Sequence, residues 1–143
     1  MPSFLLDTNV VSELRRKPHQ RNAQFHQWAL ELRVEDSYLS VITLGEVVCG
    51  VLLLERRDPA AGRVLQNWLS DTVRPDYRER TLPVTAEISE REATLHLVRT
   101  LPKADALIAA TALVHDLTLV TRNTKDFHGL GIRLVNPWQF RRR

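Results

Sequence analysis

Short apolar runs alternate with helix-like segments from one end of this 143-residue sequence to the other. Such alternation is typical of a parallel sheet with helices on its faces. The sequence therefore predicts an α/β fold, in which ligands bind at the carboxyl ends of the strands. The expected strands span residues 4–6, 38–41, 80–84, 117–121 and 132–135, and the expected helices span residues 8–14, 23–32, 44–56, 60–69, 86–97 and 103–115. Within the helix 44–56, Gly50 marks either a weak point or a place of close packing.

The length and composition predict a single globular domain made of residues 1–143. Hydrophobic residues make up 43% of the chain and charged residues 26%, which is ordinary for a soluble protein. The single cysteine, Cys49, excludes an internal disulfide, and its apolar neighbours predict a buried position. The apolar stretch 47–54 is far shorter than the ~18 residues of a membrane span, and nothing resembles a leader, so we expect a cytoplasmic protein. The net charge of +3 permits nucleic acid binding without demonstrating it.

Four acidic residues stand where apolar segments begin or end: Asp7, Glu46, Asp105 and Asp126. Carboxylates avoid such positions unless they are paired or bound to a metal, because burying an ionised group is costly. Asp7 and Asp126 fall at or just past predicted strand ends, which is where the site of a parallel sheet belongs. If the chain brings the four residues together, they form a pocket of hard oxygen ligands suited to Mg²⁺ or Mn²⁺.

The first two acids each have an ordinary structural explanation. Asp7 can simply cap the helix that begins at residue 8. Thr43 and Glu46 fit a capping box, in which the Glu46 carboxylate accepts a hydrogen bond from the amide of the cap residue. For Asp7 and Glu46, the sequence leaves the structural and the functional interpretation equally open.

The other two acids differ in their surroundings. Asp105 lies in the first turn of a helix that is apolar almost all round. The helix dipole alone can account for a carboxylate there, but we favour a role in a site because this helix looks central. Asp126 lies in a polar loop after a strand, where aspartate is common. Asn123 in the same loop can take its place as an oxygen ligand.

Together, the motifs around these acids resemble a PIN domain and, more narrowly, the VapC/FitB-type toxins of bacterial toxin–antitoxin pairs. The matching motifs, in chain order, are Leu5-Leu6-Asp7-Thr8-Asn9, Ser40-x-x-Thr43-x-x-Glu46, Ala104-Asp105-Ala106-x-Ile108-Ala109-Ala110-Thr111-Ala112, Val120-Thr121-Arg122-Asn123-Thr124-Lys125-Asp126-Phe127 and Asn136-Pro137-Trp138. The resemblance covers essentially the whole chain. It implies a Rossmann-like α/β/α sandwich with a central, mostly parallel sheet.

The resemblance also implies a function, that of a Mg²⁺- or Mn²⁺-dependent endoribonuclease acting as a toxin. It further implies a homodimer and a cognate antitoxin, with DNA contacted only indirectly through that antitoxin. The implied catalytic residues are Asp7, Glu46, Asp105 and Asp126, with Asp7 and Asp105 as the metal ligands. Some members carry an acid where this chain has Asn123, so the fourth position and the number of bound metals stay open. The polar residues expected to line the same pocket are Thr8, Asn9, Thr121 and Asn123.

Other functions fit the sequence less well. A haloacid-dehalogenase-like phosphohydrolase requires an aspartate two residues after its nucleophile, and here that residue is Asn9. A phosphoacceptor receiver domain has two adjacent acids that this chain lacks near its N-terminus. The five histidines have neither metal-binding spacing nor an obvious catalytic partner, which disfavours a metal-free histidine ribonuclease. One alternative stays open: a weakly active or inactive partner of a DNA-binding antitoxin, acting mainly in transcriptional autoregulation.

Basic residues near the predicted site can contact RNA phosphates. Arg122 and Lys125 flank Asp126, and residues 15–17 follow the helix that starts at the site. Contacts of this kind position RNA without selecting its sequence. For most of these residues a solvated surface charge is the simpler interpretation. Trp138 is expected to pack within the protein rather than to stack on bases.

Overall fold

The computed structural model describes residues 2–142, and within them five strands form one sheet. The strands lie in the order β3–β2–β1–β4–β5, and neighbouring strands are parallel. Their bounds are Phe4–Leu6 for β1, Ser37–Ser40 for β2, Thr81–Leu82 for β3, Thr118–Val120 for β4 and Leu134–Val135 for β5. The predicted α/β fold is confirmed, and the described sheet is entirely rather than mostly parallel.

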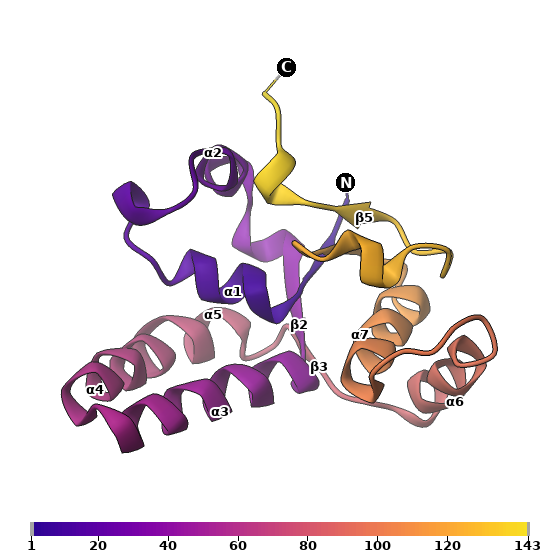
Figure 1. Cartoon of the computed structure of the whole chain (residues 1–143), viewed down its shortest axis with the longest axis horizontal. Coiled ribbons are helices and arrows are strands. Elements are labelled where there is room, and N and C mark those ends of the chain that lie inside the picture. The colour runs from indigo at the N-terminus through magenta and orange to yellow at the C-terminus, as the bar shows by residue number, and fades with distance from the viewer. Residues whose placement is uncertain (1, 143) are drawn as a thin grey trace.

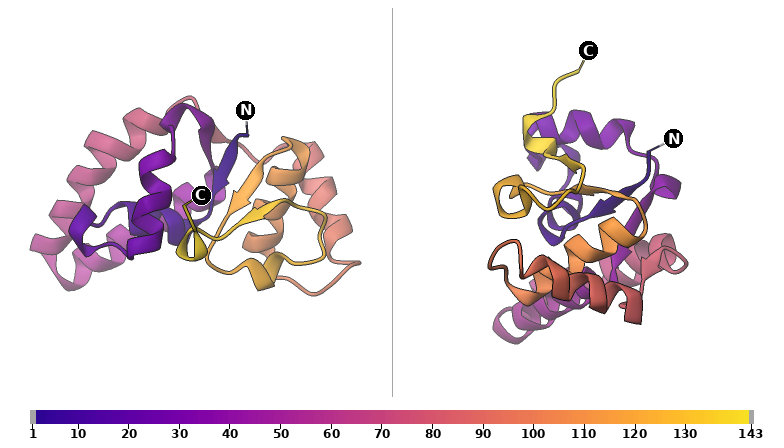
Figure 2. Two further views of the ribbon diagram at one scale, coloured as in Figure 1. Left: turned by 90° about the horizontal axis from the view of Figure 1, so that it is seen from above. Right: turned by 90° about the vertical axis from the view of Figure 1, so that its right-hand side faces the viewer.

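Helices cover both faces of this sheet (Figure 1, Figure 2). On one face, α6 and α7 enclose Leu5 of β1 and Leu119 of β4, and on the other face the remaining helices enclose Leu6 and Val120. Successive residues of a strand point to opposite faces, so β1, β2, β4 and β5 contribute to both cores and the molecule has three layers. The helices are α1 (Thr8–Leu14), α2 (Ala23–Glu31), α3 (Val41–Arg57), α4 (Pro59–Trp68), α5 (Arg74–Tyr77), α6 (Ala86–Leu95) and α7 (Lys103–Val114).

Shorter helical turns join these elements. A π-helical turn, Leu69–Val73, connects α4 to α5, and 3-10 turns span Pro18–Gln20, Val34–Asp36, Thr124–Phe127 and Pro137–Gln139. Six of the seven α-helices were predicted with bounds that differ by three residues or fewer at each end. The exception is α5, which the sequence did not predict because it continues from α4 through the π-helical turn without a break. No helix among residues 2–142 combines the length and apolar content that crossing a membrane requires.

The apolar stretch 47–54 in α3 is buried on one side only. Val47 and Val51, which are one helical turn apart, belong to the core, whereas Leu52 and Leu53 are 51% and 55% exposed. Cys49 is also exposed, so the prediction of a buried cysteine is wrong. The composition of this stretch is apolar all round, but only the face with the i, i+4 spacing reaches the sheet.

The order of the strands creates a crevice at one edge of the sheet. The chain proceeds outward from β1 through β2 to β3, then returns to the other side of β1 to form β4 and β5. The carboxyl ends of β1 and β4 therefore flank the point where the strand order reverses, which is where ligands bind in open parallel sheets. The backbone amide of Asp7 donates to the carbonyl of Val120 at 2.9 Å, so the residues that follow β1 and β4 lie side by side.

A buried carboxylate connects α6 to the first residue of α7. Glu92 is only 4% exposed, and its Oε1 lies 3.2 Å from Nζ of Lys103 and 2.9 Å from Nε2 of His96. The hydrogen bond with His96, reinforced by Lys103, lowers the pKa of Glu92 against the opposing effect of burial. Because α7 is apolar almost all round, its hydrophobic contacts alone leave its rotation about its axis poorly determined. The contact between Glu92 and Lys103 fixes one side of the helix.

Replacing Glu92 with glutamine is expected to lower the free energy of unfolding by only about 1 kcal/mol at pH 7, because the side chains of its two partners, His96 and Lys103, are exposed. The pKa of Glu92 in the folded state lies below its ordinary value of 4.5, so its stabilisation is present above pH 4.5 and is lost as the pH falls. Urea denaturation of the parent protein and the variant measures the loss in the free energy of unfolding at pH 7 and near pH 3. Glu90→Gln on the exposed side of α6 serves as the control, and an equal loss at both pH values would contradict this assignment.

Candidate functional site

Asp7 lies at the centre of the crevice, and both of its carboxylate oxygens accept hydrogen bonds. Oδ1 accepts from the backbone amide of Thr8 at 2.8 Å, so Asp7 caps α1 as predicted. Oδ2 accepts from the Thr121 hydroxyl at 2.8 Å and from Nδ2 of Asn9 at 3.4 Å. The side chain is 6% exposed. These contacts fix the orientation of the carboxylate across the junction between β1 and β4.

Glu46 reaches this site from α3. Its Oε1 accepts a hydrogen bond of 2.7 Å from the Thr8 hydroxyl, which joins the first turn of α1 to α3. The capping-box interpretation of Thr43 and Glu46 is wrong: α3 begins at Val41, and its cap is Ser40, whose hydroxyl accepts from the amide of Ile42 at 3.0 Å. Ser40 lies one turn upstream, and once it caps the helix the Glu46 carboxylate is free to point toward α1.

Thr43 is buried one helical turn before Glu46 on the same side of α3. Its hydroxyl oxygen has no hydrogen-bond partner among the described residues. A buried hydroxyl without a partner is unfavourable by about 1–3 kcal/mol. The start of α3 therefore carries unused polar capacity beside the acidic residues.

The loop after β4 supplies most of the remaining polar groups. Thr121 is fully buried and, besides donating to Asp7, accepts from the backbone amide of Asn123 at 3.1 Å. Asn9 connects the two sides of the crevice, because its Oδ1 accepts from the backbone amide of Arg122 at 3.1 Å. All four predicted polar residues, including Thr8, are thus within this hydrogen-bonded group.

Asp105 and Asp126 complete the acidic set from two further segments. Asp105 is half-buried in the first turn of α7, and Asp126 is exposed in the 3-10 turn Thr124–Phe127. Burial raises the pKa of Asp105, and repulsion from Asp7, Asp126 and Glu46 raises it further, in that order. Asp105 therefore experiences the charges of the other three carboxylates.

The pKa of Asp7 is also raised. Burial is the largest cause, and repulsion from Glu46 adds to it, while the hydrogen bonds from Thr121, Thr8 and Asn9 act in the opposite direction. No lysine, arginine or histidine within residues 2–142 forms an ion pair with any of the four carboxylates. The site thus concentrates negative charge without a cationic side chain to balance it.

The donor set fits a divalent cation in its chemistry. Four carboxylates, hydroxyl groups and an amide are hard oxygen ligands of the kind that Mg²⁺ and Mn²⁺ prefer. Across the described chain, however, no three histidine, cysteine, aspartate or glutamate side chains are close enough together to hold an ion as they stand. The structure brings the four predicted acids into one electrostatic neighbourhood, and their side chains would have to converge further to form a coordination shell.

A groove leads away from the acidic residues between α1 and α3. Its volume is about 300 Å³, with Thr8 and Glu46 at one end and the exposed Arg15 on its rim. The floor is formed by apolar residues of α3 and α4, including Val51 and Leu65. The groove therefore combines an acidic group with a basic residue among the side chains that line it.

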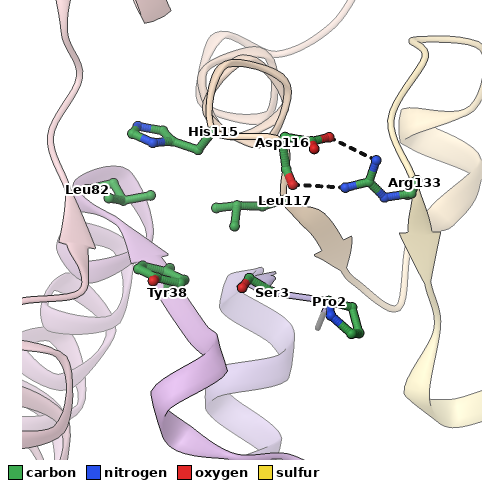
Figure 3. Close-up of a pocket in the computed structure, with 8 residues that line it drawn as sticks. All are labelled: Pro2, Ser3, Tyr38, Leu82, His115, Asp116, Leu117 and Arg133. Carbon is green, nitrogen blue, oxygen red and sulfur yellow. Dashed lines mark hydrogen bonds and ion pairs between the residues drawn. The ribbon is translucent and has the colours of Figure 1, made fainter.

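A hollow of about 340 Å³ lies at the opposite edge of the sheet (Figure 3). It is formed by residues at the amino ends of the strands, among them Ser3 and Tyr38, and by the turn between α7 and β4. Arg133 closes one side through its ion pair with Asp116 at 2.9 Å. It contains none of the predicted site residues, and its one carboxylate is already paired, so we place the functional site at the carboxyl edge.

Comparisons with known proteins identify the family of this chain. Residues 4–131 match the family model of the PIN domain. The chain is 36% identical to Toxin FitB of Neisseria gonorrhoeae (94% of this chain, 98% of the relative) and 34% identical to VapC ribonuclease Y4jK of Sinorhizobium fredii (95% and 98%). The crystal structure of FitAcB from Neisseria gonorrhoeae superimposes with a TM-score of 0.87 at 35% identity (96% and 99% covered). A toxin–antitoxin complex from Klebsiella pneumoniae superimposes with a TM-score of 0.69 at 29% identity (94% and 98%).

Proposed function

The chain belongs to the PIN-domain family and, within it, to the VapC- and FitB-type toxins, and we propose that it is a metal-dependent endoribonuclease neutralised by a cognate antitoxin. One observation carries the proposal. The charges of Asp7, Glu46 and Asp126, from three separate segments, all act on Asp105 of a fourth, and none of the four carboxylates has a cationic partner among residues 2–142. Such an arrangement is unfavourable by itself and becomes favourable with a bound cation.

Asp7 and Asp105 are the residues that we propose to hold Mg²⁺ or Mn²⁺. When bound, such an ion activates water and stabilises the charge that develops on a phosphodiester during hydrolysis. Thr121, Asn9 and the amide of Thr8 keep the Asp7 carboxylate oriented toward the crevice.

The other two acids have supporting roles in this proposal. Thr8 holds the exposed carboxylate of Glu46 at the mouth of the groove, where it can accept a proton from attacking water or bind the ion itself. Asp126 is the acid of the fourth position. In the same loop, the backbone amide of Asn123 donates a hydrogen bond to the Thr121 hydroxyl.

The surface of the protein supports the partners that family membership suggests. An apolar groove of about 280 Å³, lined among others by Leu14, Leu32 and Trp68, is flanked by Arg21 and Asp76 and offers a place for a segment of an antitoxin. The exposed leucines of α3 offer a second surface, for a homodimer or for the antitoxin. We propose that DNA is contacted only through the antitoxin. We also propose that residues 1–143 form a single domain and that the protein is located in the cytoplasm, where RNA is available.

The test is cleavage of total cellular RNA by the purified protein, freed of any partner, in Mn²⁺, in Mg²⁺ and in EDTA. Discrete fragments that require the metal, and that disappear with Asp7→Asn, would support the proposal, and mapping their ends would identify the target RNA. If cleavage is absent, or equal in the variant, the protein acts through binding. The alternative of a weakly active or inactive partner of a DNA-binding antitoxin would then replace the ribonuclease.

A further inference from the structure

Arg122 is held at the edge of the acidic site by its backbone. Its amide donates to Oδ1 of Asn9 at 3.1 Å, and its carbonyl accepts from Nδ2 of Asn136 at 3.3 Å. The same Asn9 also donates to Asp7, and the preceding residue, Thr121, donates to Asp7 at 2.8 Å. The position of Arg122 is thus coupled on both sides to the groups that orient Asp7.

Stacking also fixes the position of the Arg122 side chain. Its guanidinium carbon lies 5.2 Å from the centre of the Trp138 ring, in a cation–π arrangement. Trp138 in turn packs against Phe25, with ring centres 4.8 Å apart, and its amide donates to Oδ1 of Asn136 at 3.0 Å. The sequence predicted the packing role of Trp138, but not that its ring supports an arginine.

The guanidinium of Arg122 donates no hydrogen bond and forms no ion pair to any residue in the described part of the chain. The residue is exposed, and Asp126 lies only four positions further along. An arginine whose backbone adjoins an acidic site often pairs with one of the carboxylates, but the guanidinium of Arg122 lies over the Trp138 ring instead. Stacking on the Trp138 ring leaves all five donors of the guanidinium available.

We propose that Arg122, supported by Trp138, binds a phosphate of the RNA strand that enters the acidic site. This inference rests on the proposed ribonuclease function and adds to it the residue that positions the substrate. A planar guanidinium with free donors binds a phosphate through two parallel hydrogen bonds. Because the stacking already restricts the side chain, little further conformational entropy is lost on binding. The carboxylates repel the RNA backbone, so the positive charge of Arg122 adds to the attraction that the proposed metal ion exerts on a phosphate.

The test compares Arg122→Gln with Arg57→Gln, which makes the same change in net charge. Arg57 ends α3 eleven residues after Glu46, so it lies about 17 Å from that site residue along the helix axis. Both changes are made in an Asp105→Asn background, and binding of a fluorescein-labelled single-stranded RNA of mixed sequence is measured by anisotropy over a range of salt concentrations. We expect Arg122→Gln to weaken binding about tenfold and to reduce the salt slope by about 0.7, with little change for Arg57→Gln.

A second measurement separates a role in substrate positioning from a structural one. In the otherwise unmodified protein, Arg122→Gln should raise KM about tenfold and leave kcat and the melting temperature nearly unchanged, because the contact is made before and during the reaction alike. Arg122→Lys should recover part of the affinity through its charge alone. Equal RNA binding by the Arg122 and Arg57 variants would overturn this inference, while cleavage by the parent protein would leave the ribonuclease in place.

Two further outcomes also decide the matter. If Arg122→Gln lowers the melting temperature and kcat together, its role is structural and the inference fails. If RNA binding is unchanged but copurification with the antitoxin is lost, the stacked arginine is a protein-docking residue instead. Absence of RNA cleavage by the parent protein in every metal would remove the proposed function and this inference together.

Discussion

Replacing Asp105 with asparagine is expected to lower RNA cleavage on the order of 10³-fold and to raise the melting temperature in EDTA by about 2 °C. Asp105 accepts no hydrogen bond from the described residues, so the change removes its charge without removing a contact. The negative charge of Asp105 is unfavourable in the folded protein because the residue is partly buried and because the other three acids repel it. The same charge that the proposed metal requires therefore destabilises the protein without metal.

The pH dependence of this effect has a definite sign. The pKa of Asp105 in the folded protein is raised above its ordinary value of 3.8, so the folded state is weakened as the pH rises through that pKa. Asparagine carries no charge to repel, so the advantage of the variant is present at pH 7 and shrinks toward pH 4. With Mg²⁺ added, the parent protein should have the higher melting temperature, because an ion that binds only the folded state stabilises the parent protein and not the variant.

Thermal denaturation at pH 7 and pH 4, with EDTA and with Mg²⁺, checks these expectations beside the cleavage assay. Glu87→Gln is the matched control, because Glu87 occupies the first turn of α6 as Asp105 occupies that of α7, but is exposed and is not among the charges that raise the pKa of Asp105. It should leave cleavage unchanged and give no stability gain in EDTA. A melting temperature that falls on replacing Asp105 would show that the helix dipole, not repulsion, dominates there.

The acidic positions show how far the sequence could predict a site. For Asp7 the sequence left capping and function open, and the structure shows that both apply, because one oxygen caps α1 while the other faces β4. For Glu46 the local pattern was misleading, because Ser40 and Thr43 are both favoured cap residues and the helix begins after Ser40. Local rules evaluate one helix end at a time, whereas the partner of Glu46 lies 38 residues away.

Other features depended on tertiary contacts that no local pattern reveals. The apolar residues of 47–54 could not indicate which side of α3 faces the sheet, and Cys49 proved to be on the outside. Arg122 and Trp138 are separated by 16 positions along the chain, and their contact depends on how β5 returns the C-terminal segment across the site. The parallel order of the strands, by contrast, followed from their alternation with helices, because that pattern is a property of the whole chain.

Glycine packing in the hairpin of α3 and α4 gives the largest expected change in stability. The sequence marked Gly50 as either a weak point or a place of close packing, but a Cβ atom there would meet nothing within 4 Å. The close approach is at Gly62 in α4, where a Cβ atom would lie 2.3 Å from the Cα of Glu55 and 2.9 Å from its backbone nitrogen. Asp58 alone separates the two helices, and it caps α4, so they cannot move apart easily.

Gly62→Ala is therefore expected to lower the free energy of unfolding by about 3 kcal/mol, because the added methyl group meets backbone atoms rather than a movable side chain. Gly50→Ala introduces the same group into the interior of α3 without a clash and should raise the free energy of unfolding by about 0.5–1 kcal/mol. Urea denaturation of both variants measures the difference. If Gly62→Ala proves as stable as Gly50→Ala, α4 is free to shift away from α3. The groove floor that Leu65 and Val51 form together is then adjustable rather than fixed by this contact.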